Sequence, residues 1–338
     1  MKAEEILETA NSLITGDKGI LAMDEDNTSL DAKFKTMGLP ETEDLRRACR
    51  ELIVTTPGLG DYLSGAILNA ETVLQATKEG VSFVDLLKEA GVISGIKVDS
   101  GVVDLAGFPG EKITLGLDSL RERLVDYRDL GMRFASWRAV IDIGKDIPST
   151  GCIAANMHDL ARYAALCQEA GVLPIVEAEV LMNGDHSIER CFEVTGKALG
   201  ELFRQLEEQR VDLHGILLKP NMILPGIGSS RQVSIADVAN ATVECMMKNV
   251  PRMVPGIAFL SGAQSPELST AHLNMIHLRR RLPWAITFSF SSAIQQPAME
   301  KWKGREENIK PAQQLLYRRI MLNAMARRGE YEPAMENN

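Results

Sequence analysis

The sequence lacks the residue patterns that would place it in several large classes of protein. Its five cysteines, Cys49, Cys152, Cys167, Cys191 and Cys245, are odd in number, spread along 338 residues and free of any C-x-x-C spacing. This distribution is typical of free thiols in a reducing compartment and argues against a disulfide framework or a zinc site. The five histidines form no i, i+4 pair and no H-x-x-E-H-like cluster, so the sequence predicts no metal site.

Long hydrophobic runs and excess positive charge are also missing. No apolar run reaches the roughly 18 residues that a membrane-spanning helix needs. The first seven residues are acidic and amphipathic, which is not the pattern of a signal peptide. The net charge of −9 argues against nucleic acid or an anionic membrane as a partner. We therefore expect a cytoplasmic protein that binds neither nucleic acid nor a membrane.

Short apolar segments alternate with longer amphipathic ones along the chain. The apolar segments predict eight strands, and the amphipathic ones predict helices, with Ser234 and Asp237 forming a capping box at the start of one helix. The predicted strands span residues 19–24, 63–69, 95–100, 134–141, 173–180, 215–221, 256–262 and 284–290. The predicted helices include residues 120–130, 157–169, 188–208 and 235–248.

This alternation predicts the α/β class, because continuous apolar strands separated by helices form a parallel sheet covered by helices. Eight such units without a Pro/Gly-rich linker favour a closed (β/α)8 TIM barrel, a single domain over residues 1–338. A doubly wound open sheet is the alternative, weakened because no G-x-G-x-x-G follows the first strand. The polar tail from about residue 329 is predicted to be mobile.

Charged and polar residues stand at the carboxyl ends of most predicted strands, and in a barrel these ends converge on one mouth. Lys219 ends an apolar strand just before Pro220. Burial there would lower the pKa of the amine, and the neutral amine could attack a carbonyl as a Schiff-base lysine. The alternative is that Lys219 only marks where the strand reaches water. The strand ends deliver Asp24, Lys97, Asp99, Ser136, Arg138, Glu177, Glu179, Lys219, Ser261, Gly262, Ser289, Ser291 and Ser292.

Glu177 and Glu179 form a distinct pair on the fifth predicted strand. Residues two apart on a strand point to the same face. Both carboxylates are therefore predicted to face the barrel interior, where crowding and burial would raise the pKa of one of them into the range of an acid–base catalyst.

These motifs, taken in order, resemble the class I, Schiff-base-forming fructose-1,6-bisphosphate aldolases over almost the whole chain. The matching segments are GILAMDE at 19–25, GIKVD at 95–99, VEAE at 176–179, LLKPNM at 217–222, FLSGAQS at 259–265 and WAITFS at 284–289. The resemblance implies a (β/α)8 barrel, an aldehyde-lyase without metal or cofactor, and a homo-oligomer, either a tetramer or a dimer.

The resemblance also implies roles for individual residues. Lys219 is expected to form the Schiff base, and Glu177, with Glu179 beside it, to handle the dehydration of the carbinolamine. Asp24 is expected to take the proton from the substrate hydroxyl next to the bond that is cleaved. The other expected contacts with substrate come from Lys97 and Arg138 as cations, from Ser261 and Gly262 as part of a phosphate cradle, and from Asp26, Ser29, Ser136, Ser289, Ser291 and Ser292.

Several positions depart from the family pattern at the expected phosphate contacts. The family's F-A-K-W-R is FASWR at 134–138, so Ser136 replaces a catalytic lysine. The family's F-S-Y-G-R is FSFSS at 288–292, so Ser291 replaces a glycine and Ser292 a phosphate-binding arginine. The family's D-E-S-T-G-S is DEDNTS at 24–29 in this chain, so Asp26 brings a carboxylate to a position where the family binds phosphate. The chain also ends without the C-terminal tyrosine typical of eukaryotic members.

Two cations are therefore lost and one anion gained in a site built for two phosphates. Each charge-assisted hydrogen bond to phosphate contributes roughly 1.5–3 kcal/mol. These changes favour an aldolase that keeps Schiff-base chemistry, acts on a ketose, sugar phosphate or related carbonyl compound, and has diverged from fructose-1,6-bisphosphate, with weak or absent activity on it. Two alternatives remain open: a glycolytic fructose-bisphosphate aldolase with substitute phosphate contacts, and a catalytically silent aldolase fold that binds a partner.

Overall fold

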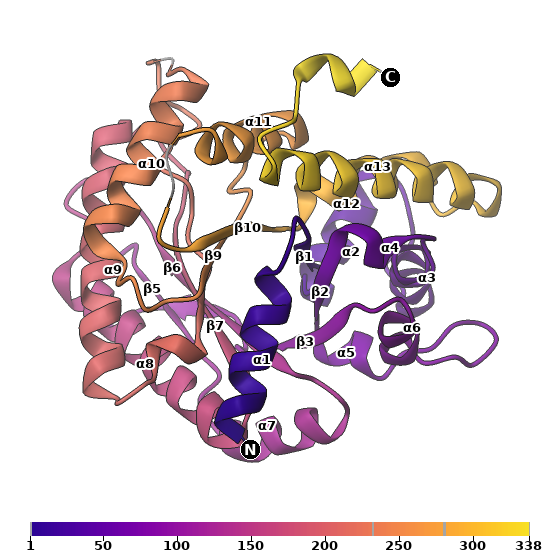
Figure 1. The fold of residues 1–338 in the computed structure, drawn as a ribbon, viewed down its shortest axis with the longest axis horizontal. Helices are drawn as coiled ribbons and strands as arrows, with labels where there is room; N and C mark the ends of the chain where they lie inside the picture. The colour runs from indigo at the N-terminus through magenta and orange to yellow at the C-terminus, as the bar shows by residue number, and fades with distance from the viewer. Residues whose placement is uncertain (1, 232, 280–281, 338) are drawn as a thin grey trace.

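Eight parallel strands close into a barrel in the computed structural model, which describes residues 2–231, 233–279 and 282–337. Around the barrel the strands follow the order β1-β10-β9-β8-β7-β6-β3-β2, and helices surround them (Figure 1). The predicted (β/α)8 barrel is confirmed, and the closed ring of strands excludes the doubly wound open sheet.

Each of the eight predicted strands has a counterpart in the barrel. Two of them, β6 and β7, have the predicted bounds. β8 is much shorter than predicted, since Pro220 lacks an N–H to donate to a neighbouring strand. The barrel strands are β1 Gly19–Ala22, β2 Leu63–Leu68, β3 Ile93–Lys97, β6 Phe134–Ile141, β7 Leu173–Val180, β8 Leu217–Leu218, β9 Gly256–Phe259 and β10 Ala285–Phe290.

The helices begin where capping side chains satisfy their first N–H groups. The capping box of Ser234 and Asp237 is present at the start of α10. Ser149 caps α8, which begins at Thr150, seven residues before the predicted start of that helix. The α-helices are α1 Lys2–Ile14, α2 Asn27–Thr36, α3 Glu43–Val54, α4 Leu59–Tyr62, α5 Ala70–Val73, α6 Phe83–Glu89, α7 Leu120–Asp129, α8 Thr150–Ala170, α9 Ile188–Glu208, α10 Ile235–Asn249, α11 Pro266–His277, α12 Ser292–Trp302 and α13 Ile309–Arg327. Short 3-10 helices cover Leu213–Gly215, Glu306–Asn308 and Pro333–Asn337.

A small antiparallel hairpin outside the barrel was not predicted. It pairs β4, Val102–Asp104, with β5, Lys112–Thr114. Its strands are three residues long, and β4 is exposed along its length, so they carry no apolar run of the kind that marked the barrel strands.

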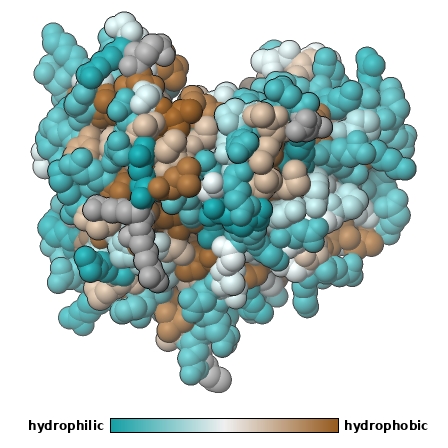
Figure 2. All heavy atoms as spheres, turned by 45° about the horizontal axis from the view of Figure 1, so that its top comes forward, coloured by the Kyte–Doolittle hydropathy of each residue, from teal (hydrophilic) through white to brown (hydrophobic). Residues whose placement is uncertain are grey.

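Hydrophilic side chains cover most of the face drawn in Figure 2, and hydrophobic ones gather mainly in its left half.

The amino-terminal helix covers the end of the barrel opposite the strand carboxyl ends, and it lies in front of the strands in Figure 1. Its buried side chains Ile6, Ala10 and Leu13 join an apolar cluster with Ile20 and Phe134 from the barrel interior. Because α1 and this apolar cluster fill one end, polar side chains inside the barrel can meet a ligand only at the other end.

The carboxy-terminal helix α13 is tied to the barrel by a buried arginine. The Arg327 guanidinium donates to the carbonyl oxygens of Ile286, Lys18 and Ile14, which lie on β10 and at the junction of α1 and β1. The tail beyond α13 also makes contacts. Tyr331 is 5% exposed, and Arg319 binds both carboxylate oxygens of Glu336 at 2.6 and 2.7 Å. These contacts hold the tail against α13 and argue against its predicted mobility. The mobility itself is not tested and stays a prediction.

Candidate active site

The predicted site residues come together in one pocket at the carboxyl ends of the barrel strands. The pocket has a volume of about 300 Å³. Of the residues predicted at the strand ends or as substrate contacts, all except Asp99 and Ser136 line it; they are Asp24, Asp26, Ser29, Lys97, Arg138, Glu177, Glu179, Lys219, Ser261, Gly262, Ser289, Ser291 and Ser292. Ser136 lies directly behind Glu177, with 3.5 Å between its Oγ and the Oε2 of the glutamate.

Lys219 lies at the base of this pocket and is 4% exposed. Its backbone N–H donates to the carbonyl of Val176 at 2.9 Å, which continues the β7–β8 pairing by one residue before Pro220 ends the strand. Its Nζ lies 3.0 Å from Oε2 of Glu177. Lys219 is therefore a buried group in a polar pocket, and the interpretation of a lysine that only marks where a strand meets water is wrong.

The prediction that burial leaves Lys219 with a lowered pKa is also wrong for the protein without a ligand. Burial lowers the pKa of the amine, but the carboxylates of Glu177, Asp24 and Glu179 outweigh it, and the pKa is raised. The lysine is thus held as an ammonium in an ion pair. To act as a nucleophile it must pass a proton to a neighbouring carboxylate, and Glu177 is in hydrogen-bond contact.

Arg138 lies beside the two glutamates of β7. Its Nε is 2.5 Å from Oε2 of Glu179 and 3.9 Å from Oε1 of Glu177. Burial raises the pKa of Glu179 although Arg138 opposes the rise, and the nearby Glu177 carboxylate adds to it. Both glutamates line the pocket, as their spacing predicts, and the pKa of Glu179 is raised; the role of either as the acid–base catalyst stays a prediction.

The contact between Glu177 and Lys219 leads to a prediction for catalysis. Replacing Glu177 by Gln keeps the shape of the side chain and removes its capacity to take the proton of the ammonium. We expect turnover of the native substrate to fall by about 10²-fold or more, with an unchanged circular dichroism spectrum. Glu244→Gln, on the exposed face of α10, is the matched control. A loss below about threefold for Glu177→Gln would contradict the role.

Asp24 faces the same lysine from the end of β1. Burial raises the pKa of Asp24 from 3.8 to about 6; Lys219 opposes the rise and Glu177 adds to it. A carboxyl that titrates near pH 6 is ionised at neutral pH and basic enough to accept a proton from a substrate hydroxyl.

The raised pKa of Asp24 predicts a stability change with a defined pH window. The folded protein binds this proton more tightly than the unfolded chain, so the contribution of Asp24 to stability is present below about pH 4 and is lost as the pH rises through 6. Asp24→Asn should therefore raise the free energy of unfolding by about 1–3 kcal/mol above pH 6 and by little at pH 4. Urea unfolding at several pH values measures this, with Asp126→Asn on the exposed face of α7 as control. An equal effect at pH 4 and pH 7 would contradict it.

Each of the four cationic side chains lining the pocket pairs with a carboxylate. The pairs of Lys219 and Arg138 with the glutamates of β7 are described above. In addition, Nζ of Lys33 lies 2.7 Å from Oε2 of Glu25, and Nζ of Lys97 lies 2.5 Å from Oδ1 of Asp99. Lys33 comes from α2 and Lys97 from the end of β3. Among the described residues of the lining, no cation is left without an anionic partner.

Asp26 lies in the pocket lining and also has a structural task. Its two carboxylate oxygens accept hydrogen bonds from the N–H and the hydroxyl of Ser29, at 2.8 and 2.9 Å, and so cap α2. Burial would raise the pKa of Asp26, but the bonds from Ser29 outweigh it and the pKa is lowered. Asp26 therefore keeps a negative charge at the mouth, as predicted, and Ser29 is occupied as its partner.

A left-handed loop after β9 forms another wall of the pocket. Gly262 and Ala263 have φ values of 53° and 58°. The side chain of Gln264 holds this loop, because its Nε2 donates to the carbonyl of Ser261 at 2.6 Å and its Oε1 contacts Nδ1 of His272 at 2.5 Å. Burial lowers the pKa of His272 to about 4, so at neutral pH the imidazole is uncharged. Sequence reasoning missed Gln264 and His272, because their contact joins a loop residue to a residue of α11 that lies eight positions later in the chain.

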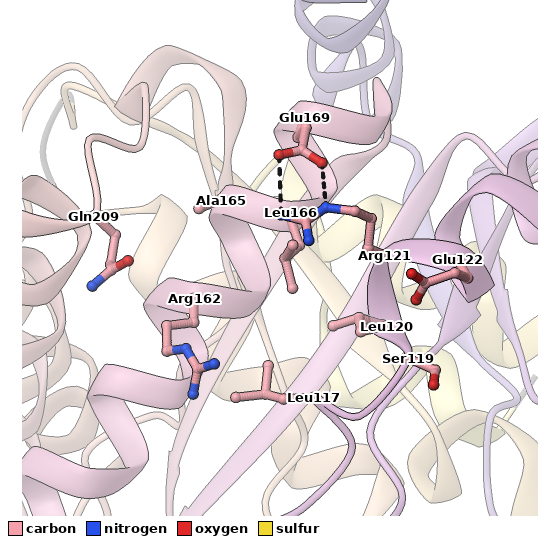
Figure 3. A pocket seen from close by; sticks show the side chains of 10 residues that line it. All are labelled: Leu117, Ser119, Leu120, Arg121, Glu122, Arg162, Ala165, Leu166, Glu169 and Gln209. Atoms are coloured by element: carbon pink, nitrogen blue, oxygen red, sulfur yellow. Dashed lines mark hydrogen bonds and ion pairs between the residues drawn. The ribbon is translucent and has the colours of Figure 1, made fainter.

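A second groove of the molecule lacks this concentration of reactive groups. Figure 3 shows a groove of about 370 Å³ between α7 and α8, where Arg121 pairs with Glu169 at 2.6 Å. No barrel strand contributes to its lining. Within the described residues there is no group of three or more His, Cys, Asp or Glu side chains that could hold a metal ion. No helix of the described part of the chain has both the length and the hydropathy of a membrane span.

Fold and pocket together define the class: a (β/α)8-barrel enzyme with its ionisable groups at the carboxyl ends of the strands. A family model described as "Glycolytic: Fructose-bisphosphate aldolase class-I" matches residues 5–338. The chain belongs to the class I fructose-bisphosphate aldolase family. It is thus an aldehyde-lyase of the class that works through a Schiff-base lysine and needs no metal.

Individual relatives match over nearly the full length of the chain. A probable fructose-bisphosphate aldolase class 1 of Xanthomonas campestris is 51% identical, with 98% of this chain and 100% of the relative covered. Cytosolic fructose-bisphosphate aldolase 4 of Arabidopsis thaliana is 45% identical, with 98% and 85% covered. In a crystal structure of fructose-bisphosphate aldolase from Plasmodium falciparum in complex with TRAP and a small-molecule inhibitor, the aldolase fold superimposes with a TM-score of 0.96 at 41% identity, covering 98% of this chain and 96% of that one.

Proposed function

We propose that this protein is a Schiff-base aldolase that acts on a ketose, sugar phosphate or related carbonyl compound and has diverged from fructose-1,6-bisphosphate. The observation that carries the proposal is the contact of Lys219 with Glu177 in a pocket whose cations are all paired. A phosphate dianion entering this pocket would have to displace carboxylates from those cations. At roughly 1.5–3 kcal/mol for each charge-assisted bond, this opposes the binding of two phosphates.

The proposed reaction uses the groups that converge on Lys219. Glu177 takes a proton from the ammonium, and the freed Nζ attacks the carbonyl carbon to form a carbinolamine. Glu177 returns its proton to the carbinolamine hydroxyl, which leaves as water when the C–O bond breaks and the iminium forms. Asp24 then takes the proton of the hydroxyl beyond the bond to be cleaved. That carbon–carbon bond breaks, its electron pair neutralises the iminium as an enamine, and an aldehyde leaves. Protonation of the enamine and addition of water release the ketone and restore Lys219.

The second candidate function is that of a glycolytic fructose-bisphosphate aldolase with substitute phosphate contacts. The specific observation in its favour is the full-length identity of 45–51% to proteins named as fructose-bisphosphate aldolases. In this case Lys33 and Lys97 would have to leave Glu25 and Asp99 when substrate binds. Substrate preference therefore separates the two candidates, because both use the same lysine.

We also propose a cytoplasmic homo-oligomer, a tetramer or a dimer. Exposed apolar side chains on and beside the β4–β5 hairpin support a contact between subunits there; Val102 is 45% exposed, Val103 44% and Leu115 46%. Light scattering coupled to gel filtration measures the oligomeric state, and a monomer at micromolar concentration would contradict this part of the proposal.

Borohydride trapping against a panel of ketoses, ketose phosphates and other carbonyls tests the proposed function. Borohydride reduces the imine, so the bound carbonyl stays on the lysine and appears in the intact mass. We expect Lys219 to be the modified residue, and dihydroxyacetone phosphate to need a high concentration. Trapping of dihydroxyacetone phosphate at low concentration would favour the glycolytic candidate. No trapping by any carbonyl would overturn both and indicate a silent fold.

A further inference from the structure

The hydroxyl group of Ser289 is buried in the pocket wall and has no partner among the described residues. Ser289 lies on β10 between Phe288 and Phe290, opposite Ile20 of β1, and is 1% exposed. It lines the pocket that holds Lys219, and its Oγ forms no hydrogen bond with any described residue. A buried hydroxyl left unsatisfied costs about 1–3 kcal/mol, so such groups are normally paired. The group that satisfies it is expected to arrive with a ligand.

Two more serine hydroxyls lie on the same wall. Ser291 and Ser292 follow Ser289 where β10 passes into α12, and both line the pocket. The side chain of Ser291 does not cap the helix. Its Oγ accepts a bond from Nε2 of Gln295 at 3.2 Å, and Gln295 is fixed in turn by donating to the carbonyl of Ala22 at 2.7 Å. This wall is therefore held in place and offers uncharged groups that both donate and accept.

The remaining groups around Lys219 determine which ligand suits this wall. The carboxylates of Asp24 and Glu177 accept hydrogen bonds only, and Arg138, like the other pocket cations, is already paired. A phosphate dianion brings acceptors and negative charge, and would lie against these carboxylates with no free cation. A hydroxymethyl group brings one donor and one acceptor without charge, which matches a serine hydroxyl that lacks a partner.

We infer that the end of the substrate carbonyl compound that rests on β10 and the start of α12 is an unphosphorylated hydroxymethyl group. The donor ketone would then be of the dihydroxyacetone class rather than its phosphate. This inference rests on the proposed function, because it presumes that the ketone is joined to Lys219. It assigns Ser289 as the residue that recognises the hydroxyl, with Ser291 and Ser292 completing the wall.

Borohydride trapping of the full-length protein with dihydroxyacetone, dihydroxyacetone phosphate, pyruvate and acetone tests this. The half-saturating concentration for modification of Lys219 is read from intact mass and peptide mapping. Dihydroxyacetone is expected to trap at a concentration at least about tenfold below that of its phosphate, a difference that one or two unfavourable polar contacts produce. Preference for the phosphate, or for the carboxylate of pyruvate, would overturn the inference while leaving the Schiff base in place. If none of the four is trapped at Lys219, the proposed function fails and the inference fails with it.

Ser289→Ala separates recognition from a structural effect. It should raise the half-saturating concentration of dihydroxyacetone by about three- to tenfold, as expected for one hydrogen bond to an uncharged group. Acetone, which has no hydroxyl, should trap as it does on the wild type. Ser94→Ala, at a buried serine of β3 outside the pocket lining, is the matched control and should change neither. Equal losses for dihydroxyacetone and acetone in Ser289→Ala would show that the hydroxyl only supports the site.

Discussion

Lys219→Met is expected to abolish covalent trapping and to lower turnover of the native substrate by about 10⁴-fold or more, which is typical when the nucleophile of a covalent mechanism is removed. Methionine keeps an unbranched chain of similar length and cannot form an imine. The change also removes the nearer cation of Glu177, at 3.0 Å, and leaves Arg138 at 3.9 Å, so some loss of stability is expected because this buried charge is less well compensated. Turnover and borohydride labelling are therefore measured at a temperature where circular dichroism shows a folded protein.

Two controls make this result specific. Lys97→Met removes another lysine of the same pocket and should leave labelling at residue 219 detectable, because Lys97 is paired with Asp99 and is 19% exposed at the side chain. Lys248→Met removes an exposed lysine of α10 and should change nothing. If the Lys219→Met protein gains the same ligand mass on a different pocket lysine, the assignment of the Schiff base is wrong.

The triple change Asp26→Ser, Ser136→Lys, Ser292→Arg is expected to create fructose-1,6-bisphosphate cleavage. It restores two cations and removes one anion, a shift of +3 in the pocket and, at Ser136, directly beside it. Charges in a partly desolvated site couple strongly, so the gain should exceed the sum of the single changes. Serine at position 26 can still cap α2, which keeps the fold of the mouth intact.

The three positions should act on different kinetic constants. Ser136 is 1% exposed and lies next to Glu177, so a lysine there would compete with Lys219 for that carboxylate and lower the pKa of Lys219. It should therefore act mainly on kcat, whereas Ser292→Arg at the start of α12 should act mainly on KM. Activity on the native substrate should fall as cleavage of the bisphosphate rises.

A charge-matched variant controls for long-range electrostatics. Glu8→Ser, Asn11→Lys and Ser12→Arg make the same +3 change on the helix that covers the opposite end of the barrel, and should not create activity. Specificity would be set by the loops after β1 and β10 instead if the triple mutant folds and forms the Lys219 imine with its own substrate, yet gains no bisphosphate cleavage.

The positions of the site residues were readable from the sequence because the rule behind them is local. Short apolar runs marked the strands, and in a parallel barrel every strand delivers its carboxyl end to the same mouth. Lys219, Glu177, Glu179 and Asp24 were assigned in this way and do line one pocket. The capping box of α10 was equally local, since it depends on two residues three apart.

The electrostatic state of the site was not readable in this way, because it depends on which groups meet across strands. The pKa of Lys219 is raised and not lowered, since carboxylates from β1 and β7 converge on it. The pairings of Lys33 with Glu25 and of Lys97 with Asp99, and the use of Asp26 as a helix cap, likewise depend on loop geometry. The hairpin of β4 and β5 escaped prediction since its strands bury little.

The steady-state cleavage of fructose-1,6-bisphosphate by the wild-type protein tests the central claim most directly. The account predicts a kcat/KM below about 10⁴ M⁻¹s⁻¹, the lower end for enzymes acting on their own substrates, in a protein that still forms a borohydride-reducible imine at Lys219. A kcat/KM at or above that value would contradict the claim that phosphate recognition has been lost, and would identify the protein as a glycolytic fructose-bisphosphate aldolase whose paired cations are released when substrate binds.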